Sequence, residues 1–385
     1  MATDLPRADH LEAMLVSLED AFAPVRWNIP QDFMSYEHFE RVVQDLDWTS
    51  SPGYPYLLNA PTNGSFFQVQ NGVPSREAKH RVWQVLSQRL LDGSCDPIRL
   101  FIKPEPHKVS KLETGRYRLI SAVSVVDQII DSMLFGEMNQ NMVEHCLEIP
   151  SKFGWSPYVG GWKVVPQKGL AIDKSSWDWT MQGWLFQVIL ELRSRLCLTM
   201  GEPLKEWQRL ATWRYKCLFG HPEFILSNGL VLSQVHPGVM KSGCVNTIAD
   251  NSIAQVVLHL RVCLEMGIPA GWIWTMGDDT LQESLPQEGE YLAHLSRYCI
   301  VKESTHKIEF AGHQFRVDSI EPSYFAKHCF NLLHADPLVV PDLAVSYALL
   351  YHKSKKRDFI HRVIRELGGI PASPRMIAQI YDGLW

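Results

Sequence analysis

Three aspartates stand where two apolar segments of the chain are expected to form short strands. Asp173 follows the apolar segment 170–172, and Asp278 and Asp279 form the tip of a Gly-Asp-Asp hairpin that begins near Trp272. Carboxylates on rigid backbone are ligands that Mg²⁺ prefers, and two such ions can bind the attacking and leaving oxygens of an in-line phosphoryl transfer. Taken alone, Gly-Asp-Asp is more typical of a surface turn, and an Asp repeated after five residues indicates little.

Polar side chains with helical spacing lie between the two acidic segments. Thr247 and Asn251 are four residues apart in an expected helix, so they share one face, and Ser242-Gly243 precedes them as a tight loop. A hydroxyl and an amide on that face could recognise a ribose 2′-OH, which both donates and accepts hydrogen bonds. Asp178 could join them. The alternative is that Ser242 caps the helix and that Asn251 is a solvated polar position.

The positive charge of the chain is concentrated locally. The net charge is −5, which by itself argues against a nucleic-acid partner. Between residues 99 and 118, however, six Lys or Arg residues face only two acids, and such a stripe is what binding to phosphates requires. A second basic run, residues 352–357, lies in a helical C-terminal pattern. It could face an RNA duplex or be a solvated helix face.

The composition is that of an ordinary soluble globular protein, with 46% hydrophobic and 21% charged residues. Its 385 residues allow two or three subdomains. The longest apolar candidate, residues 253–267, is interrupted by polar residues, so no membrane-spanning helix is expected. The eight cysteines form no C-x-x-C pair, which argues against a disulfide scaffold and a zinc site and favours a reducing cytosol.

The elements that must position these residues follow from periodicity and turn formers. We expect helices over residues 82–91, 127–144, 180–196 and 247–266, strands over 99–102 and 170–172, and a rigid loop over 49–56. Two carboxylate-bearing strands beside two helices indicate an α+β sheet with helices packed on one face.

The order of these patterns resembles the motifs of viral RNA-dependent RNA polymerases from positive-strand RNA viruses. D-x-x-x-x-D, S-G-x-x-x-T-x-x-x-N and G-D-D resemble motifs A, B and C. Lys103-Pro-Glu through Arg118-Leu-Ile resembles motif F, and residues 49–55 resemble the template-guiding motif G. Residues 300–307 and 308–315 resemble motifs D and E. The strings KPEPHK, LETGRYRLISAVSVVDQ and MGDD are most similar to the sobemovirus-like group, although Met276 replaces a bulkier aromatic residue of many relatives.

The resemblance implies a right-handed fingers–palm–thumb polymerase with an antiparallel palm sheet backed by helices, closed by fingertips that touch the thumb. The implied domains are fingers 1–165 with N-terminal fingertips, palm 166–194, fingers 195–238, palm 239–318 and thumb 319–385.

The resemblance also implies a role for each matching residue. Asp173, Asp278 and Asp279 would be catalytic and bind two Mg²⁺ ions, with Mn²⁺ as a substitute, and Lys307, preferred over Lys302, would donate a proton to pyrophosphate. The incoming triphosphate would be bound by Lys103, Lys111, Arg116, Arg118, Asp178, Ser242, Thr247 and Asn251. The template would pass Ser51, Gly53 and Pro55.

The implied partners are an RNA template, the product duplex and ribonucleoside triphosphates. A viral genome-linked protein or a polyprotein neighbour could be a further partner. The expected location is a replication complex in the host cell cytoplasm.

Two other functions remain open from the sequence. A reverse transcriptase shares the metal-binding carboxylates but usually places a bulky gate where this chain has Asp178. An RNA-binding scaffold with an inactive palm would not need all three metal-binding aspartates, and all three are present here.

Overall fold

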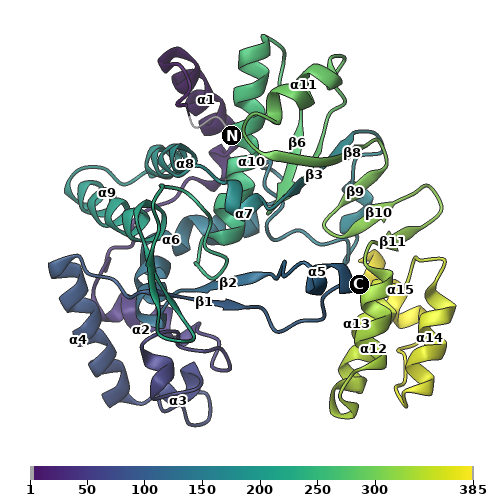
Figure 1. Cartoon of the computed structure of the whole chain (residues 1–385), viewed down its shortest axis with the longest axis horizontal. Helices are drawn as coiled ribbons and strands as arrows, with labels where there is room; N and C mark the ends of the chain where they lie inside the picture. Colours follow the sequence, from purple (N-terminus) through teal and green to yellow (C-terminus); the bar gives the residue numbers. More distant parts are fainter. Residues whose placement is uncertain (1–3, 384–385) are drawn as a thin grey trace.

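The computed structural model describes residues 4–383, which form helices and three small sheets (Figure 1). The sheet that carries the aspartates has the order β6-β7-β3-β8, and all its neighbours are antiparallel. Its strands are β3 (Leu170–Ser175), β6 (Ile273–Met276), β7 (Asp279–Gln282) and β8 (Ile300–Thr305). Asp173 lies inside β3 instead of ending it, because Lys174 and Ser175 continue to pair with β8 after a register shift. The antiparallel α+β prediction is confirmed for this sheet.

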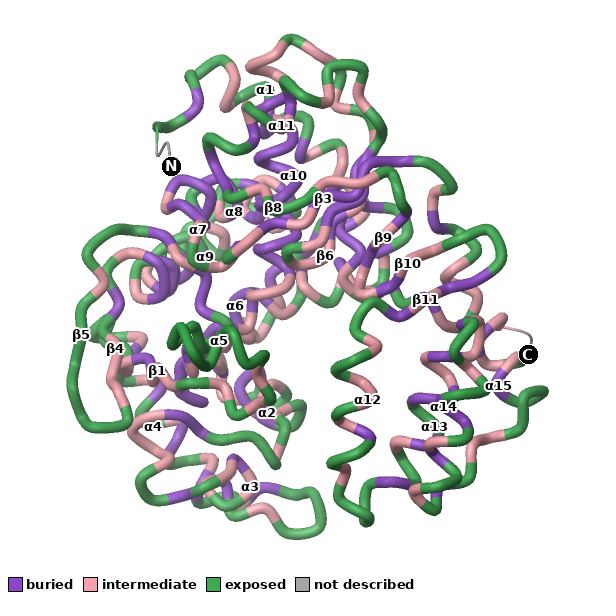
Figure 2. Tube along the Cα trace, turned by 45° about the vertical axis from the view of Figure 1, so that its right-hand side comes forward, coloured by how far each residue is buried: buried purple, intermediate pink, exposed green. Residues whose placement is uncertain are grey.

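Helices pack on this sheet or against the helices that do. They are α1 (Ala8–Ala21), α7 (Trp177–Thr180), α8 (Gly183–Arg195), α10 (Thr247–Met266) and α11 (Glu288–Leu295). Helix α10 is buried along most of its length and packs against β6, α8, α11 and α1 (Figure 2). The helix expected over 180–196 is interrupted, because Met181 is extended and Gln182 forms a β-bridge with Gly238.

A second sheet has the order β2-β1-β4-β5. Its strands are β1 (Ile98–Ile102), β2 (Leu119–Ala122), β4 (Glu223–Leu226) and β5 (Val231–Ser233). The parallel pairing of β1 with β4 joins segments more than a hundred residues apart, and local sequence patterns do not predict it. The surrounding helices are α2 (Tyr36–Gln44), α3 (Asn63–Phe66), α4 (Arg76–Asp92), α5 (Val109–Glu113), α6 (Val125–Glu144) and α9 (Glu202–Tyr215). Helix α5 is exposed throughout (Figure 2).

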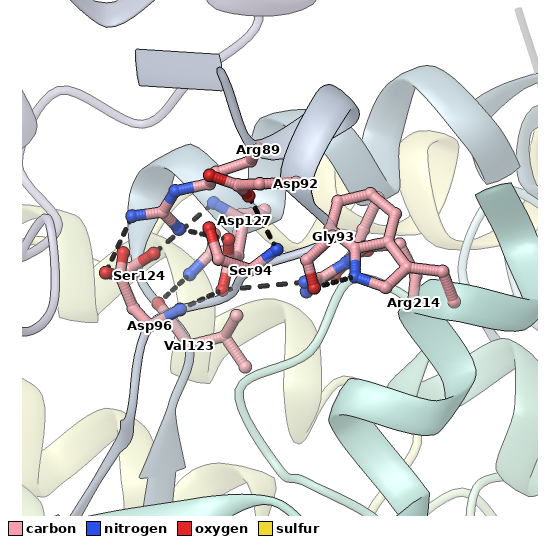
Figure 3. A network of polar contacts seen from close by, with 12 residues as sticks. Arg89, Asp92, Gly93, Ser94, Asp96, Val123, Ser124, Asp127 and Arg214 are labelled. Atoms are coloured by element: carbon pink, nitrogen blue, oxygen red, sulfur yellow. Dashed lines mark hydrogen bonds and ion pairs between the residues drawn. The ribbon is translucent and has the colours of Figure 1, made fainter. Parts of the chain in front are cut away.

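Buried ion pairs brace the helices around this second sheet (Figure 3). Arg214 of α9 contacts Asp131 of α6 at 2.6 Å and Asp127 at 3.6 Å. Arg89 of α4 pairs with the same Asp127 and, at 2.6 Å, with Asp96. Two arginines thus hold three acids, so α4, α6 and α9 share one charge network in the core.

The third sheet is a meander of β9 (Ile308–Phe310), β10 (His313–Phe315) and β11 (Ile320–Pro322). It leads into α12 (Phe325–Leu333), α13 (Val340–Leu350), α14 (Arg357–Glu366) and α15 (Pro374–Asp382), which have a core of their own. The pairing of β10 with β11 carries the sheet past the boundary expected at residue 318.

Contacts join the C-terminal helices to segments far earlier in the chain, and the segment between α13 and α14 is also bonded to Glu321 of β11. Lys327 of α12 lies 3.4 Å from Glu105, which precedes α5. Lys163 donates to the backbone oxygen of Asp382 in α15. Within the described part of the chain, no helix has both the length and the apolar character that crossing a membrane requires.

Candidate active site

Strand pairing brings the three aspartates together at one end of the first sheet. Ile172 of β3 is paired with Thr280 of β7. Asp173 directly follows Ile172 and Asp279 directly precedes Thr280, so the two aspartates lie at the same end of neighbouring strands. Asp278 lies in the tight turn between β6 and β7. The carboxylates predicted from separate stretches of sequence therefore meet at one edge.

The charges of these carboxylates act on one another. Burial, followed by the negative charges of Asp278 and Asp173, raises the pKa of Asp279 to about 6. The exposed ammonium of Lys302 forms an ion pair with Asp173. A site where carboxylates repel each other favours a bound cation, so the donor set fits Mg²⁺.

The three carboxylates lie near one another, but they do not converge on one point as the ligands of a bound ion would. Among residues 4–383, no three acidic, histidine or cysteine side chains are grouped tightly enough to hold a metal ion. Asp173 is paired with Lys302 instead.

Helix α10 fixes the acidic turn. Gln255 donates its side-chain amide to the backbone oxygen of Asp278 at 3.0 Å, and the Ser252 hydroxyl accepts from the Gly277 backbone N–H at 2.9 Å. The Thr275 hydroxyl donates to the Ser252 backbone oxygen. Sequence reasoning missed these supports, although Ser252 and Gln255 were visible as polar interruptions of an apolar helix.

Three further groups near the carboxylates were also missed. Lys174 is buried beneath them and donates to the Thr280 hydroxyl at 3.0 Å, and burial lowers the pKa of its ammonium. The backbone of Ala311, at the tip between β9 and β10, hydrogen-bonds to Asp279 and counteracts the rise of its pKa. The three carboxylates help to raise the pKa of Tyr324, after burial, so its phenol lies within reach of their charge. No local pattern marks these residues.

Two of the residues expected to recognise ribose, Asn251 and Asp178, are hydrogen-bonded to each other. Asn251 donates to the Asp178 carboxylate at 2.8 Å, and the carbonyl oxygen of the same Asn251 amide is buried without a hydrogen-bond partner. Burial raises the pKa of Asp178 and the Asn251 hydrogen bond opposes that rise. An unsatisfied buried acceptor beside a carboxylate is suited to a ligand hydroxyl that donates.

Ser242 and Thr247 shape the loop before α10. The Ser242 hydroxyl accepts from the Ser121 backbone N–H at 3.1 Å, and the Thr247 hydroxyl lies 2.8 Å from the backbone oxygens of Lys241 and Cys244. A Cβ on Gly243 would lie 2.5 Å from the Ser121 oxygen, so only glycine permits this close approach to β2. The helix-cap alternative for Ser242 is not what the structure shows, since its hydroxyl is bound to β2.

The basic stripe lies on β1, on α5 and in the segments that join them to β2. Glu105 lies 3.1 Å from Arg118 and 3.3 Å from Lys103, so one acid holds two of the expected triphosphate ligands. The charge of Arg118 also lowers the pKa of Asp178 against the larger effect of burial, which places Arg118 toward the ribose group. Lys111 and Arg116 are exposed in and after α5.

The expected template loop lies against the start of α6. A Cβ on Gly53, whose φ is +72°, would lie 2.9 Å from the Ser124 Cα. The Ser51 hydroxyl accepts from the Gly53 backbone N–H at 3.3 Å, and Pro55 follows a cis peptide bond. The loop is ordered by its own backbone and by α6.

Lys307 is the expected residue that the structure does not bring to the carboxylates. Asp173 is paired with Glu303 across β3 and β8, whereas Lys307 lies beyond Thr305 in the turn to β9. Its neighbour His306 contacts the backbone oxygen of Gly169, four residues before Asp173. Lys302 is the β8 lysine at the aspartates.

Aspartates on neighbouring strands, a polar helix face and a basic stripe are the parts of a nucleotidyl-transferring polymerase site. The chain matches the family of viral RNA-dependent RNA polymerases over residues 11–297, and it belongs to that family. The resemblance inferred from the motifs is thereby confirmed.

Relatives from plant viruses support this membership. The chain is 30% identical to Protein P1-P2 of Pea enation mosaic virus-1 over 89% of its own length and 31% of the relative. It is 32% identical to Protein P1-P2 of a Potato leafroll virus strain, covering 85% of the chain and 33% of the relative. It is also 32% identical to Replicase polyprotein P2AB of Southern cowpea mosaic virus, covering 68% and 29%. The chain spans about a third of the length of these relatives.

Proposed function

We propose that this chain copies an RNA template into RNA by transferring nucleotides from ribonucleoside triphosphates to an RNA 3′-hydroxyl. Family membership supports this function, and the meeting of Asp173, Asp278 and Asp279 at the β3–β7 edge is the observation that carries it. Viral genome replication and transcription are the processes that such a reaction serves.

We propose a fingers–palm–thumb arrangement for this molecule. The aspartate sheet with α8 and α10 corresponds to the palm, in ranges 166–194 and 239–318. The sheet of β1 and β2 with its helices corresponds to the fingers, in ranges 1–165 and 195–238, and the C-terminal helices to the thumb, 319–385. The Glu105–Lys327 contact, between the segment before α5 and α12, supports a closure of fingertips on thumb. The outermost residues of the first and last ranges lie outside the described structure.

Two Mg²⁺ ions, with Mn²⁺ as a substitute, would be held by the three aspartates and would stabilise the attacking and leaving oxygens. Gln255 and Ser252 keep the Gly-Asp-Asp turn in place. The orientation of the carboxylates therefore does not depend on the loop alone.

The substrate is positioned by charge and by hydrogen bonds. Arg118 and Lys103 bind the triphosphate when it replaces Glu105 as their anionic partner, and Lys111 and Arg116 add to the positive field. Asn251 accepts from the ribose 2′-OH with its unpaired oxygen, and Asp178 orients the same amide. Ser242 and Thr247 hold the loop that carries them, and the template enters past Ser51, Gly53 and Pro55.

The proton donor to the departing pyrophosphate is proposed to come from the β8 region. Sequence similarity favours Lys307, whereas geometry favours Lys302, because its ammonium contacts Asp173. Lys302→Leu and Lys307→Leu decide between them. The donor's variant flattens the basic limb of the pH–rate profile, and the other variant does not.

The names of the relatives support a proposal for the wider setting. Their names, Protein P1-P2 and Replicase polyprotein P2AB, support a polyprotein neighbour for this chain, and a viral genome-linked protein is a further candidate partner. RNA template, product duplex and ribonucleoside triphosphates are the partners of the reaction itself. We place the reaction in a replication complex in the host cell cytoplasm.

An extension assay tests the function. Purified protein is given poly(C), GTP and Mg²⁺, and incorporation is compared between wild type, Asp278→Asn and a surface control, Asp20→Asn. The proposal expects incorporation by wild type and the control only. Equal incorporation by Asp278→Asn would remove this aspartate from the mechanism, and preference for dGTP would favour a reverse transcriptase. An absence of incorporation with intact RNA binding would favour the scaffold.

A further inference from the structure

A basic cleft lies at the end of the aspartate sheet that is remote from the aspartates. It encloses about 880 Å³. Its charged lining among the described residues, apart from two histidines, consists of Lys307, Arg316, Lys353, Lys355, Arg357 and Asp318. We call this feature the basic cleft. The lining has five cations and one acid, and three of the cations are paired, Lys353 with Asp382, Lys355 with Asp318 and Arg357 with Asp358.

The cations come from two sides of the cleft. Lys307 lies in the turn between β8 and β9, and Arg316 lies in the turn between β10 and β11, where it donates to Gln314. The opposite side is the segment between α13 and α14, where Lys355 lies 2.7 Å from Asp318. Within residues 4–383, neither Lys307 nor Arg316 forms an ion pair of 4 Å or less, although the charge of Arg316 helps to lower the pKa of Glu321. Their charge is left for a ligand.

The basic cleft is separate from the site of the three aspartates. His306 contacts Gly169, which directly precedes β3, and Asp173 lies four residues further along the chain. At about 3.3 Å per residue this is roughly 13 Å. The β9–β11 meander spans the same interval. Its tip at Ala311 reaches Asp279, and its other end, at Arg316, lines the cleft.

The size and the charge pattern indicate the ligand. A volume of 880 Å³ corresponds to roughly thirty water molecules, which is far more than one phosphate group fills. Arginine forks and lysine point charges distributed on two sides suit a chain of phosphates. Trp162, whose ring lies 4.4 Å from the Lys353 ammonium, adds an aromatic surface to the lining.

We propose that the basic cleft binds a single-stranded segment of RNA outside the site of nucleotide addition. The choice of RNA among phosphate-bearing chains rests on the proposed function, whereas the anionic character of the ligand rests on the cleft alone. An RNA strand bound in the basic cleft is held at one end of the β9–β11 meander. The other end of the meander contacts Asp279. This raises the effective concentration of the strand at the aspartates.

Charge reversal at the cleft tests the proposal. Lys355→Glu/Arg357→Glu is compared with Lys205→Glu/Arg209→Glu on α9, whose side chains are similarly exposed and also paired with acids. Both pairs are placed in an Asp278→Asn background, so no nucleotide is added. Binding of fluorescently labelled oligo(U) is followed by anisotropy over a series of salt concentrations.

The expected result is loss of one class of RNA site in the cleft variant only. The slope of log affinity against log salt, taken over all RNA binding, should fall in magnitude by about 1.4, roughly 0.7 for each of two phosphate contacts on a single strand. Because charge reversal could also unfold α14, a second measurement uses the unaltered chain. RNA should protect Lys353 and Lys355 from acetylation.

The proposal is overturned if the cleft variant keeps the stoichiometry and salt slope of the α9 control. It is also overturned if inorganic pyrophosphate, but not oligo(U), protects the two lysines. Wild-type incorporation on poly(C) is scored separately, so an inactive polymerase with a functioning cleft is distinguishable from the reverse.

Discussion

Acidic side chains have opposite electrostatic surroundings in the helical core around α6 and at the edge of the aspartate sheet. In the core, Asp131 is held by Arg214, and Asp250 is held by Arg193 at 2.8 Å and by the Tyr215 hydroxyl at 2.8 Å. At the sheet edge, the nearest cations to the three aspartates are the exposed Lys302 and the buried Lys174, and the pKa of Asp279 rises to about 6.

The difference separates structural charge from functional charge. An arginine that is buried with its acid has no freedom to exchange that partner, since breaking the pair leaves a buried charge uncompensated. A carboxylate cluster with an excess of negative charge is destabilised in the empty protein and stabilised when a cation binds. We therefore expect substitutions in the core to change stability and substitutions at the sheet edge to change activity.

The largest effect is expected at the sheet edge. Asp173→Asn should lower nucleotide incorporation by about a thousandfold or more, because a metal-held transition state loses several kcal/mol of stabilisation. Its free energy of unfolding should stay equal or rise, since one repelling charge is removed. Single-turnover incorporation and urea unfolding measure the two quantities. An Asp173→Asn protein that keeps its activity but loses stability would contradict the expected functional role of this region.

The next effect is expected in the core. Arg214→Met should lower the free energy of unfolding by about 3–5 kcal/mol, because Asp131 stays buried without its partner. The double variant Arg214→Met/Asp131→Leu should recover much of that loss, since the unpaired acid is removed as well. Urea unfolding curves measure the free energy of unfolding of the two variants and of the wild type. A double variant no more stable than the single one would contradict a pair-based explanation.

The pH dependence of stability sharpens the contrast. In EDTA, Asp279 keeps a proton up to about pH 6 in the folded protein, whereas its ordinary pKa is 3.8. The folded state then binds more protons than the unfolded state between these values, so this group's contribution to stability falls as pH rises from about 4 to 6. The size is at most about 3 kcal/mol, and less where water screens the carboxylate. Asp279→Asn should remove this slope, whereas a slope unchanged in the variant would refute the assignment.

The smallest effect concerns substrate choice. Asn251→Leu should reduce the preference for GTP over dGTP by about tenfold, which corresponds to one hydrogen bond of roughly 1.4 kcal/mol. Matched incorporation rates with the two nucleotides give the ratio. Thr247→Val is the comparison variant, because its hydroxyl contacts backbone oxygens of its own loop. A ratio unaffected by Asn251→Leu would show that this amide does not recognise the 2′-OH.

Local patterns predicted the parts of the molecule that local sequence determines. The helix over 247–266 is confirmed, as are the β1 strand and the hairpin at Asp278. The family was also recognisable, because several motifs in one order specify more than any single motif does. The meeting of the three aspartates depended on β3 and β7 being neighbours, which the sequence suggested only through that order.

Long-range pairings were beyond local patterns. The parallel β1–β4 pair, the support of Asp278 by Gln255 and the partner of each buried arginine depend on segments far apart in the chain. Asp131 and Asp173 are both aspartates in apolar stretches of sequence, so the sequence alone does not distinguish their roles. Only the fold shows that one faces an arginine and the other a cluster of acids. Lys307 shows the same limit, since spacing favoured it and the register of β8 places Lys302 at the aspartates.

Binding of Mn²⁺, followed by electron paramagnetic resonance, shows whether the three aspartates hold the metal ions. Wild type, Asp173→Asn/Asp278→Asn and the control Asp20→Asn are titrated with Mn²⁺ in the presence of GTP. We predict that wild type and the control bind two ions per chain and that the double variant loses them. Equal binding by all three proteins would contradict it, because the ions would then be held away from the aspartates of β3 and the β6–β7 turn.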